Sequence, residues 1–170
     1  MGVLEILQFP HPTLRKRALE IKEIDERVHR LVEAMTVTMY RAPGIGLAAP
    51  QVGVPDRLIL VDLSAGDKPG ELVVLLNPQI ICKEGEIQLE EGCLSVPDLR
   101  ETVTRCRRVV VKGLDLEGHS VEVEGEDLMA VALQHEIDHL DGVLFIDRLS
   151  QLKRSRYVAR LKKALNPGNP

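Results

Sequence analysis

Residues 134–140 read QHEIDHL and lie inside a longer apolar stretch, residues 127–140, that reads DLMAVALQHEIDHL. The stretch is apolar on most faces, which predicts a helix buried at the centre of the domain. Residues i and i+4 of a helix project from the same face, so His135 and His139 can bind one metal ion. Glu136 lies between them and can act as a general base toward a metal-activated water. The pattern H-E-x-x-H is therefore compatible with metal-dependent hydrolysis.

A catalytic metal site usually takes three protein ligands and leaves one position for water. Downstream of His139 the chain contains no His, Glu or Cys. Asp141 is too near in sequence to serve, and Asp147 follows an apolar turn, so the third ligand should lie upstream. The chemically suitable upstream side chains are Cys82, Cys93, Cys106, His11, His29 and His119.

Cys93 is the strongest of these candidates. It lies in EEGCLSVP, residues 90–97, where Gly92 allows an unusual backbone conformation or a close approach. The pattern indicates a shaped loop that presents one thiol, rather than a regular strand. Cys82 is interpreted as a small core residue and Cys106 as a structural residue in a strand. The three upstream histidines carry no partner pattern, and we expect them to be non-functional.

A third segment, residues 43–53, reads PGIGLAAPQVG. Its small and apolar residues suit a loop whose backbone runs against a ligand, and Gln51 is the one side chain able to polarise a carbonyl. It is not a phosphate loop, because it lacks the pattern G-x-x-x-x-G-K-[ST]. Taken alone, the segment is equally well explained as a connection between a helix and a strand.

Together, the three segments resemble the peptide deformylases. The family's motifs G-x-G-x-A-A-x-Q, E-G-C-L-S and Q-H-E-x-D-H occur in order at residues 44–51, 91–95 and 134–139, with no departure at any motif position. The resemblance extends from the N-terminal segment to the last helix. It implies a hydrolase that removes the formyl group from N-formylmethionyl nascent peptides. In that reaction a metal-bound water attacks the formyl carbon and formate is released.

The resemblance also implies a role for each site residue. One divalent metal ion would be bound by three side chains, those of Cys93, His135 and His139. Fe2+ is the ion implied in the cell, with Zn2+, Ni2+ or Co2+ as possible substitutes. Glu136 would act as general base and acid, while Gln51 and the backbone N–H of Leu94 would hold the oxyanion. The residues implied to contact the peptide or its methionine are Ile45, Gly46, Gly92, Arg100, Leu128, Val131 and Ala132.

Two other classes of function remain open. The first is a different metal-dependent amidase or peptidase that uses the same site on another acyl group. The second is a structural metal site in a binding module, although a closed structural site would need a fourth protein ligand. A lesser variant of the enzyme hypothesis is a thiol nucleophile at Cys93 paired with a histidine. Activity after metal removal distinguishes that variant.

The pattern along the chain predicts an α+β fold. Residues 25–40 carry apolar side chains at helical spacing, with Asp25 as a plausible N-cap and Pro43 beyond the end. Short runs rich in β-branched residues predict strands in mixed or antiparallel sheets at residues 58–63, 72–76, 109–111 and 121–123. We therefore expect sheets packed around the central buried helix, with one N-terminal and one C-terminal helix.

Length and composition limit the number of domains, the make-up of the core and the expected partners. A chain of 170 residues is most economically one domain, and the absence of Trp means that Val, Leu, Ile and Ala build the core. The net charge of −4 gives no reason to expect DNA binding. Three irregularly spaced cysteines do not indicate a disulfide framework. The sequence shows no leader and no membrane-spanning run, so we expect a cytoplasmic protein with no membrane contact, and a monomer.

The C-terminal segment differs in charge from the rest. From residue 143 onward there are seven basic residues and one acidic residue, and a basic helix is expected at about residues 148–166. The simpler interpretation is a solvated amphipathic helix that packs on its own domain. The alternative is contact with the ribosome, because the resemblance implies that some family members dock through a basic C-terminal helix.

Overall fold

The protein is described here by a computed structural model that covers residues 2–168. Within this range the α-helices are α1 (Glu26–Arg41), α2 (Leu128–Leu140) and α3 (Gln151–Leu165). Three short 3-10 helices are η1 (Pro12–Arg15), η2 (Ala49–Val52) and η3 (Phe145–Arg148). The strands are β1 (Gly46–Ala48), β2 (Leu58–Val61), β3 (Val73–Glu84), β4 (Ile87–Cys93), β5 (Val96–Arg105), β6 (Arg108–Leu114) and β7 (Ser120–Glu126).

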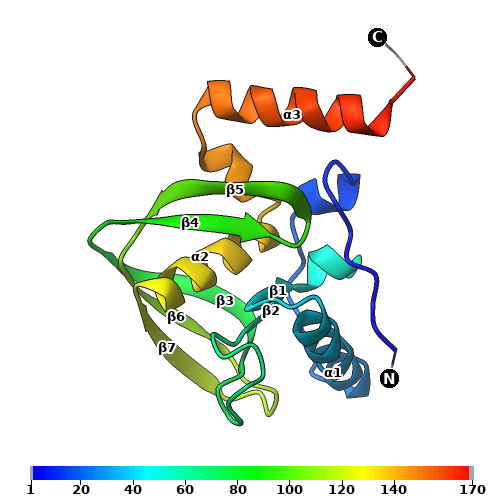
Figure 1. Cartoon of the computed structure of the whole chain (residues 1–170). Coiled ribbons are helices and arrows are strands. Elements are labelled where there is room, and N and C mark those ends of the chain that lie inside the picture. The colour runs from blue at the N-terminus through cyan, green and yellow to red at the C-terminus, as the bar shows by residue number, and fades with distance from the viewer. Residues whose placement is uncertain (1, 169–170) are drawn as a thin grey trace.

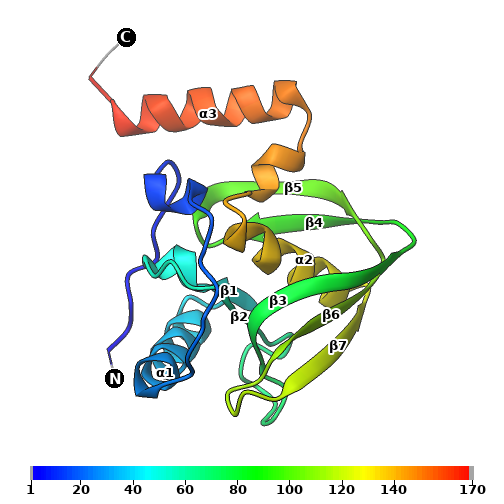
Figure 2. The same ribbon diagram turned by 180° about the vertical axis from the view of Figure 1, so that it is seen from behind.

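The strands form two antiparallel sheets with α2 between them (Figure 1). The larger sheet has five strands in the order β1-β2-β3-β6-β7, and the smaller one is the hairpin β4–β5. The view from behind shows the same order of layers, with α1 beside β1 and β2 (Figure 2). The expected α+β fold, with sheets around a central helix and further helices on either side in sequence, is confirmed.

Helix α2 is buried along most of its length, as its apolar sequence predicts. Ten of its 13 residues are buried. Ala130, Leu133 and Ile137 pack in one cluster with residues of the larger sheet, such as Ile59 and Val111. This packing faces the sheet, so the opposite side of α2 is left to face the hairpin β4–β5 (Figure 1). The central helix is thus a rigid base on which functional side chains can be presented.

Helix α1 begins where the sequence predicts. The side chain of Asp25 accepts a hydrogen bond from the backbone N–H of Val28 and so caps the helix N-terminus. Val32, Met35 and Met39 are buried on the face toward β1 and β2. The polar face is exposed, which is the usual pattern of a helix that covers one side of a sheet.

The structure corrects the sequence prediction at all three cysteines. Cys93 ends strand β4 and pairs with Val96, so the thiol stands at a strand end and not in an irregular loop. Cys106 lies between β5 and β6, outside either strand. Cys82 is only partly buried, close to the side chains of Glu84 and Arg108, and is not a core residue.

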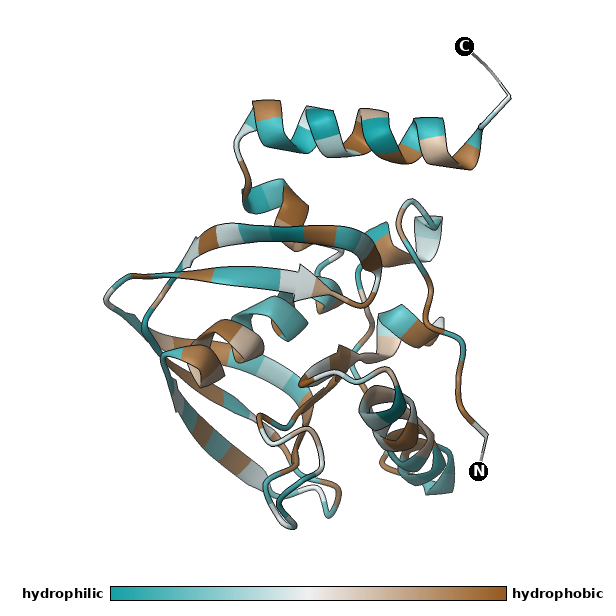
Figure 3. Cartoon of the chain, viewed as in Figure 1, coloured by the Kyte–Doolittle hydropathy of each residue, from teal (hydrophilic) through white to brown (hydrophobic). Residues whose placement is uncertain are grey.

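Strand β7 follows the alternation of apolar and polar residues, whereas β2 is apolar and buried at every position. Figure 3 shows this as alternating hydrophobic and hydrophilic bands along β7. Helix α3 is largely hydrophilic, and Tyr157 is its one buried residue among those described. Within residues 2–168, no helix has both the length and the apolar composition needed to cross a membrane.

Candidate active site

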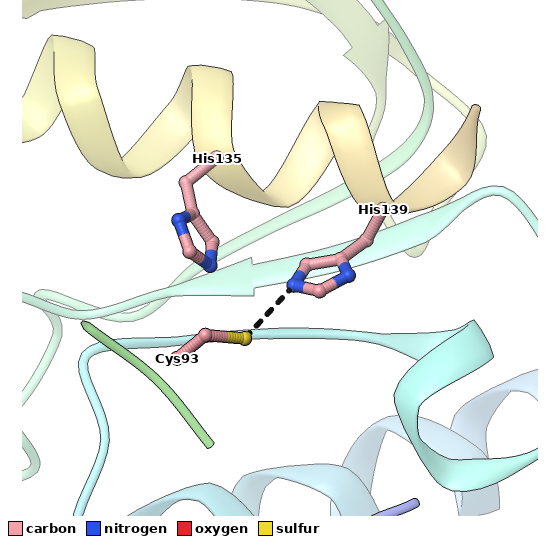
Figure 4. A group of neighbouring side chains, drawn as sticks. All are labelled: Cys93, His135 and His139. Carbon is pink, nitrogen blue, oxygen red and sulfur yellow. Dashed lines mark hydrogen bonds between the residues drawn. The ribbon is translucent and has the colours of Figure 1, made fainter. Parts of the chain in front are cut away.

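Three side chains that are far apart in sequence meet between α2 and the hairpin β4–β5 (Figure 4). They are Cys93, at the end of β4, and His135 and His139, one helical turn apart on α2. One ligand atom from each lies within 4.8 Å of the other two. The Sγ atom of Cys93 is 3.3 Å from Nε2 of His139. The structure thus brings together the three residues that the sequence predicts as metal ligands. Cys82 and Cys106 are not part of this group.

The chemistry of this group fits a divalent transition metal. Two imidazole nitrogens and one sulfur are ligands that zinc and iron-type ions accept, and three protein ligands leave a position open. In addition, Oε2 of Glu136, a residue that lines the adjoining cavity, is buried without a hydrogen-bond partner among the described residues. Unpaired buried polar atoms are rare in folded proteins. Both observations indicate a site built to hold an added group.

Glu91 orients the first histidine. Its Oε1 atom is 2.8 Å from Nδ1 of His135, so an ionised Glu91 accepts the Nδ1 proton and leaves Nε2 free for a metal. Burial on its own would raise the pKa of Glu91, but hydrogen bonds from Arg105 and His135 outweigh it and lower the pKa to about 2. Glu91 is therefore a buried carboxylate that stays charged.

Arg105 connects this carboxylate to the central helix. Its guanidinium donates two hydrogen bonds to Glu91, of 2.8 and 2.9 Å, and one of 2.6 Å to Asp138. Asp138 lies on α2 between the two histidines and also accepts two hydrogen bonds from Arg148. The side chain of Arg105 is 2% exposed and that of Glu91 is 5% exposed. This buried ionic network fixes the hairpin, with Cys93, to the helix that carries both histidines.

The sequence analysis did not predict this ionic network. One pattern in the sequence points to it: Glu91 and Cys93 are two residues apart, and such residues project from the same face of a strand. A carboxylate on the same strand face as a candidate metal ligand is well placed to accept a hydrogen bond from a metal-binding histidine.

Gln51 is held in a fixed orientation beside the cysteine. Its Oε1 atom accepts a hydrogen bond of 2.9 Å from the backbone N–H of Ala48, and its Nε2 atom donates one of 3.1 Å to Oγ of Ser95. The same Nε2 atom lies 3.7 Å from Sγ of Cys93. The side-chain amide therefore presents its N–H groups toward the hairpin turn in which Leu94 follows the cysteine.

A cavity of about 870 Å³ opens onto this group. Glu136, Gln51, Cys93, Leu94 and His135 line it, together with every residue that the sequence assigns to substrate contact: Ile45, Gly46, Gly92, Arg100, Leu128, Val131 and Ala132. The sequence did not identify Pro97, Asp98 and Leu99, which also line it. The predicted residues thus gather around one cavity, while their individual roles stay predictions.

Glu136 and Gly46 are in close contact at the inner end of the cavity. A Cβ atom at Gly46 would overlap the carboxylate of Glu136, so any larger residue here would force that side chain to move. Burial raises the pKa of Glu136 to about 7. A carboxyl group with such a pKa can both take up and release a proton near neutral pH.

Comparison with known proteins agrees with this geometry. A family model described as polypeptide deformylase matches residues 3–155. A peptide deformylase of Acidobacterium capsulatum is 48% identical over 168 residues, which cover 99% of each chain.

Solved structures show the same fold. A peptide deformylase from Legionella pneumophila is 45% identical, with a TM-score of 0.90, over 99% of this chain and all of that one. A peptide deformylase from Acinetobacter baumannii with bound Met-Ala-Ser is 36% identical, with a TM-score of 0.81, over 87% of this chain and 99% of that one. The chain therefore belongs to the polypeptide deformylase family of hydrolases.

Proposed function

We propose that this protein removes the formyl group from the N-terminal N-formylmethionine of newly synthesised polypeptides and releases formate. The observation that carries the proposal is the convergence of Cys93, His135 and His139, with Cys93 and His135 lining one cavity together with Glu136. Membership of the family supports the same reaction. Two features of the arrangement support a catalytic role. A carboxyl group of raised pKa stands next to the three candidate ligands, and the cavity gives a substrate access to them.

The three ligands would hold one divalent metal ion, Fe2+ in the cell, with Zn2+, Ni2+ or Co2+ as possible substitutes. When bound, such an ion polarises oxygen ligands and lowers the pKa of a bound water from about 16 toward 7. The hydrogen bond from His135 to Glu91 supports this assignment, because it fixes the tautomer that leaves Nε2 available.

Glu136 would move the proton in the reaction. Its buried carboxylate takes a proton from the water that attacks the formyl carbon and delivers it to the nitrogen of the leaving amine. The raised pKa of Glu136 supports this role, because a group with a pKa near the working pH transfers protons efficiently in both directions.

Gln51 and the backbone N–H of Leu94 would stabilise the oxyanion that develops on the formyl oxygen. The support for Gln51 is its fixed orientation, with Oε1 occupied by Ala48 and the N–H groups near the cysteine. A donor that is already oriented costs no reorganisation during the reaction, and one such donor lowers the barrier by about 3–4 kcal/mol in other hydrolases.

The peptide would lie along the cavity. Its backbone would contact Ile45, Gly46 and Gly92, and Arg100 would stand near the entrance. The methionine side chain would enter the apolar part lined by Leu128, Val131 and Ala132. The related Acinetobacter baumannii enzyme, whose structure contains Met-Ala-Ser, supports a short methionyl peptide as the occupant of this cavity.

Formate release from N-formyl-Met-Ala-Ser, compared with acetate release from N-acetyl-Met-Ala-Ser, tests the substrate class in nickel-loaded protein. We expect release from the formyl peptide only. Equal or preferential release of acetate would instead support the amidase of different acyl specificity. Cys93→Ser should abolish release and metal retention, whereas Cys82→Ser, a cysteine outside the site, should change neither. Activity that persists after complete metal removal would favour the thiol nucleophile.

The wider expectations are also proposals. We propose one catalytic domain over residues 1–170, acting as a cytoplasmic monomer that does not bind DNA. For α3 we propose packing on its own domain, with contact to the ribosome as the alternative role of its basic residues. Arg156 and Lys163 are exposed on α3 and make no ion pair within the described residues, so they are free to meet phosphate. Charge reversal at both positions should reduce co-sedimentation with ribosomes. Unchanged co-sedimentation would count against docking.

A further inference from the structure

Strand β5 carries an enlarged bulge at the edge of the cavity. Glu91 pairs with Glu101, and Cys93 pairs with Val96. Only Gly92 lies between the paired residues on β4, whereas four residues, 97–100, lie between them on β5. We call these four residues the β5 bulge. All four line the cavity, so the shape of its outer part depends on how the bulge is held.

The backbone of the β5 bulge is not held by its own hairpin alone. Asp98 has a positive φ of 60°, a conformation that non-glycine residues adopt at some energetic cost. A bulge also interrupts the hydrogen-bond ladder and leaves backbone carbonyls without strand partners. Contacts from outside the hairpin are therefore needed to keep this segment in one conformation.

Helix α3 supplies those contacts. The hydroxyl of Tyr157 donates a hydrogen bond of 3.0 Å to the carbonyl of Pro97, and the guanidinium of Arg160 donates one of 3.3 Å to the carbonyl of Asp98. Lys153 forms an ion pair of 2.9 Å with Glu101 at the end of the bulge. Residues 153, 157 and 160 share one helix face, and Figure 1 shows α3 running above β5.

These contacts are anchored in the protein interior. Tyr157 is 3% exposed and packs in a cluster with Val96 and Val103, on the two sides of the bulge. The guanidinium of Arg160 lies 5.6 Å from the centre of the Tyr157 ring, which holds the two donors together. The two donors therefore act as a unit fixed to the hairpin.

We propose that Tyr157 and Arg160 are positioning residues that set the shape of the outer cavity for the peptide beyond its formylmethionine. Neither side chain lines the cavity, so both act through the carbonyls of Pro97 and Asp98. The inference rests on the proposed deformylase activity. It assigns the C-terminal helix a part in substrate affinity that is separate from any contact with the ribosome.

The test compares a long and a short substrate in nickel-loaded protein. We expect N-formyl-Met-Ala-Ser to extend to the β5 bulge, and N-formylmethionine amide to occupy only the part of the cavity beside the three candidate ligands. In Tyr157→Phe and in Arg160→Ala we expect KM for the tripeptide to rise about three- to fivefold, the size of one lost hydrogen bond. The kcat for both substrates, and KM for the amide, should stay within about twofold. Lys162→Ala is the matched control, an exposed basic residue of the same helix without a side-chain contact to the bulge among the described residues.

The outcomes are distinct. A rise in KM for the tripeptide alone, in both variants and not in the control, supports the inference. Equal KM values in variants and control, or an equal loss of kcat on both substrates, would overturn it while leaving the deformylase activity established. If the unsubstituted protein released no formate from either substrate, the proposed function would fail and the inference would fall with it.

Discussion

Arg105→Met removes the centre of the buried ionic network and leaves an apolar side chain in its place. The native guanidinium donates three hydrogen bonds to two carboxylates, and its side chain is 2% exposed. After the substitution, Glu91 would remain buried without its main counter-charge. His135 would then be its one remaining partner in the network, so the hairpin would lose its charged link to α2.

The expected loss is large. Breaking a buried ion pair from one side costs about 3–5 kcal/mol, because an uncompensated charge is left in the interior. Arg107→Met is the matched control: Arg107 lies two residues further along, its side chain is 62% exposed, and its ion pair is with Asp127. An exposed pair of this kind contributes about 1 kcal/mol or less. The loss in free energy of unfolding should thus be several times larger in Arg105→Met than in Arg107→Met.

Urea unfolding of metal-free protein, followed by far-UV circular dichroism because the chain contains no Trp, measures the free energy of unfolding. Metal-free protein is required, since a bound ion stabilises the folded state by itself. A loss of less than about 1 kcal/mol in Arg105→Met, no larger than in Arg107→Met, would refute the reasoning that this network fixes the hairpin to the helix.

Three further predictions concern the site and its surroundings. Glu91→Gln should weaken metal affinity about 10- to 100-fold in chelator competition, because a neutral amide no longer raises the basicity of its histidine partner as the carboxylate does; unchanged affinity would contradict this. Gly46→Ala should lower kcat at least about tenfold with normal metal content, because the new methyl group displaces the Glu136 carboxylate; unaltered kcat would show that the carboxylate adjusts freely. Burial and the hydrogen bond to Asp62 raise the pKa of Tyr40 to about 12. The protonated Tyr40 hydroxyl therefore stabilises the folded state fully below pH 10, and this contribution to the free energy of unfolding is lost between pH 10 and 12. Between pH 9 and pH 11.5 the free energy of unfolding should fall less in Tyr40→Phe than in unsubstituted protein. An equal fall in both proteins would argue against the raised pKa of Tyr40.

The sequence predicts that the two histidines of the candidate metal site lie together, because their spacing is local. His135 and His139 are one helical turn apart, so the helix period alone places both on one face. The helix itself is visible in its apolar composition. Cys93 required a further step, since only the combination of three motifs distinguishes it from two other cysteines.

The supporting network could not be predicted in the same way. Arg105 meets Glu91 across the β4–β5 pairing and reaches Asp138 on a helix further along the chain. These contacts depend on the register of a hairpin whose strands carry many charged and polar residues, so the apolar runs that reveal the other strands are missing here. The sequence does not predict the β5 bulge for the same reason, because an irregular register between strands leaves no pattern in the local sequence.

Formate release from N-formyl-Met-Ala-Ser by nickel-loaded protein and by its Glu136→Ala variant, with the metal content of both samples measured, tests the central claim most directly. We predict rapid release by the unsubstituted protein. In the variant, release should fall by about 10²- to 10⁴-fold at the same metal content, because general acid–base catalysis by Glu136 is lost while all three ligands remain. Absence of release from a folded, metal-loaded sample would contradict the proposed function, and full release by the variant would contradict the role of Glu136.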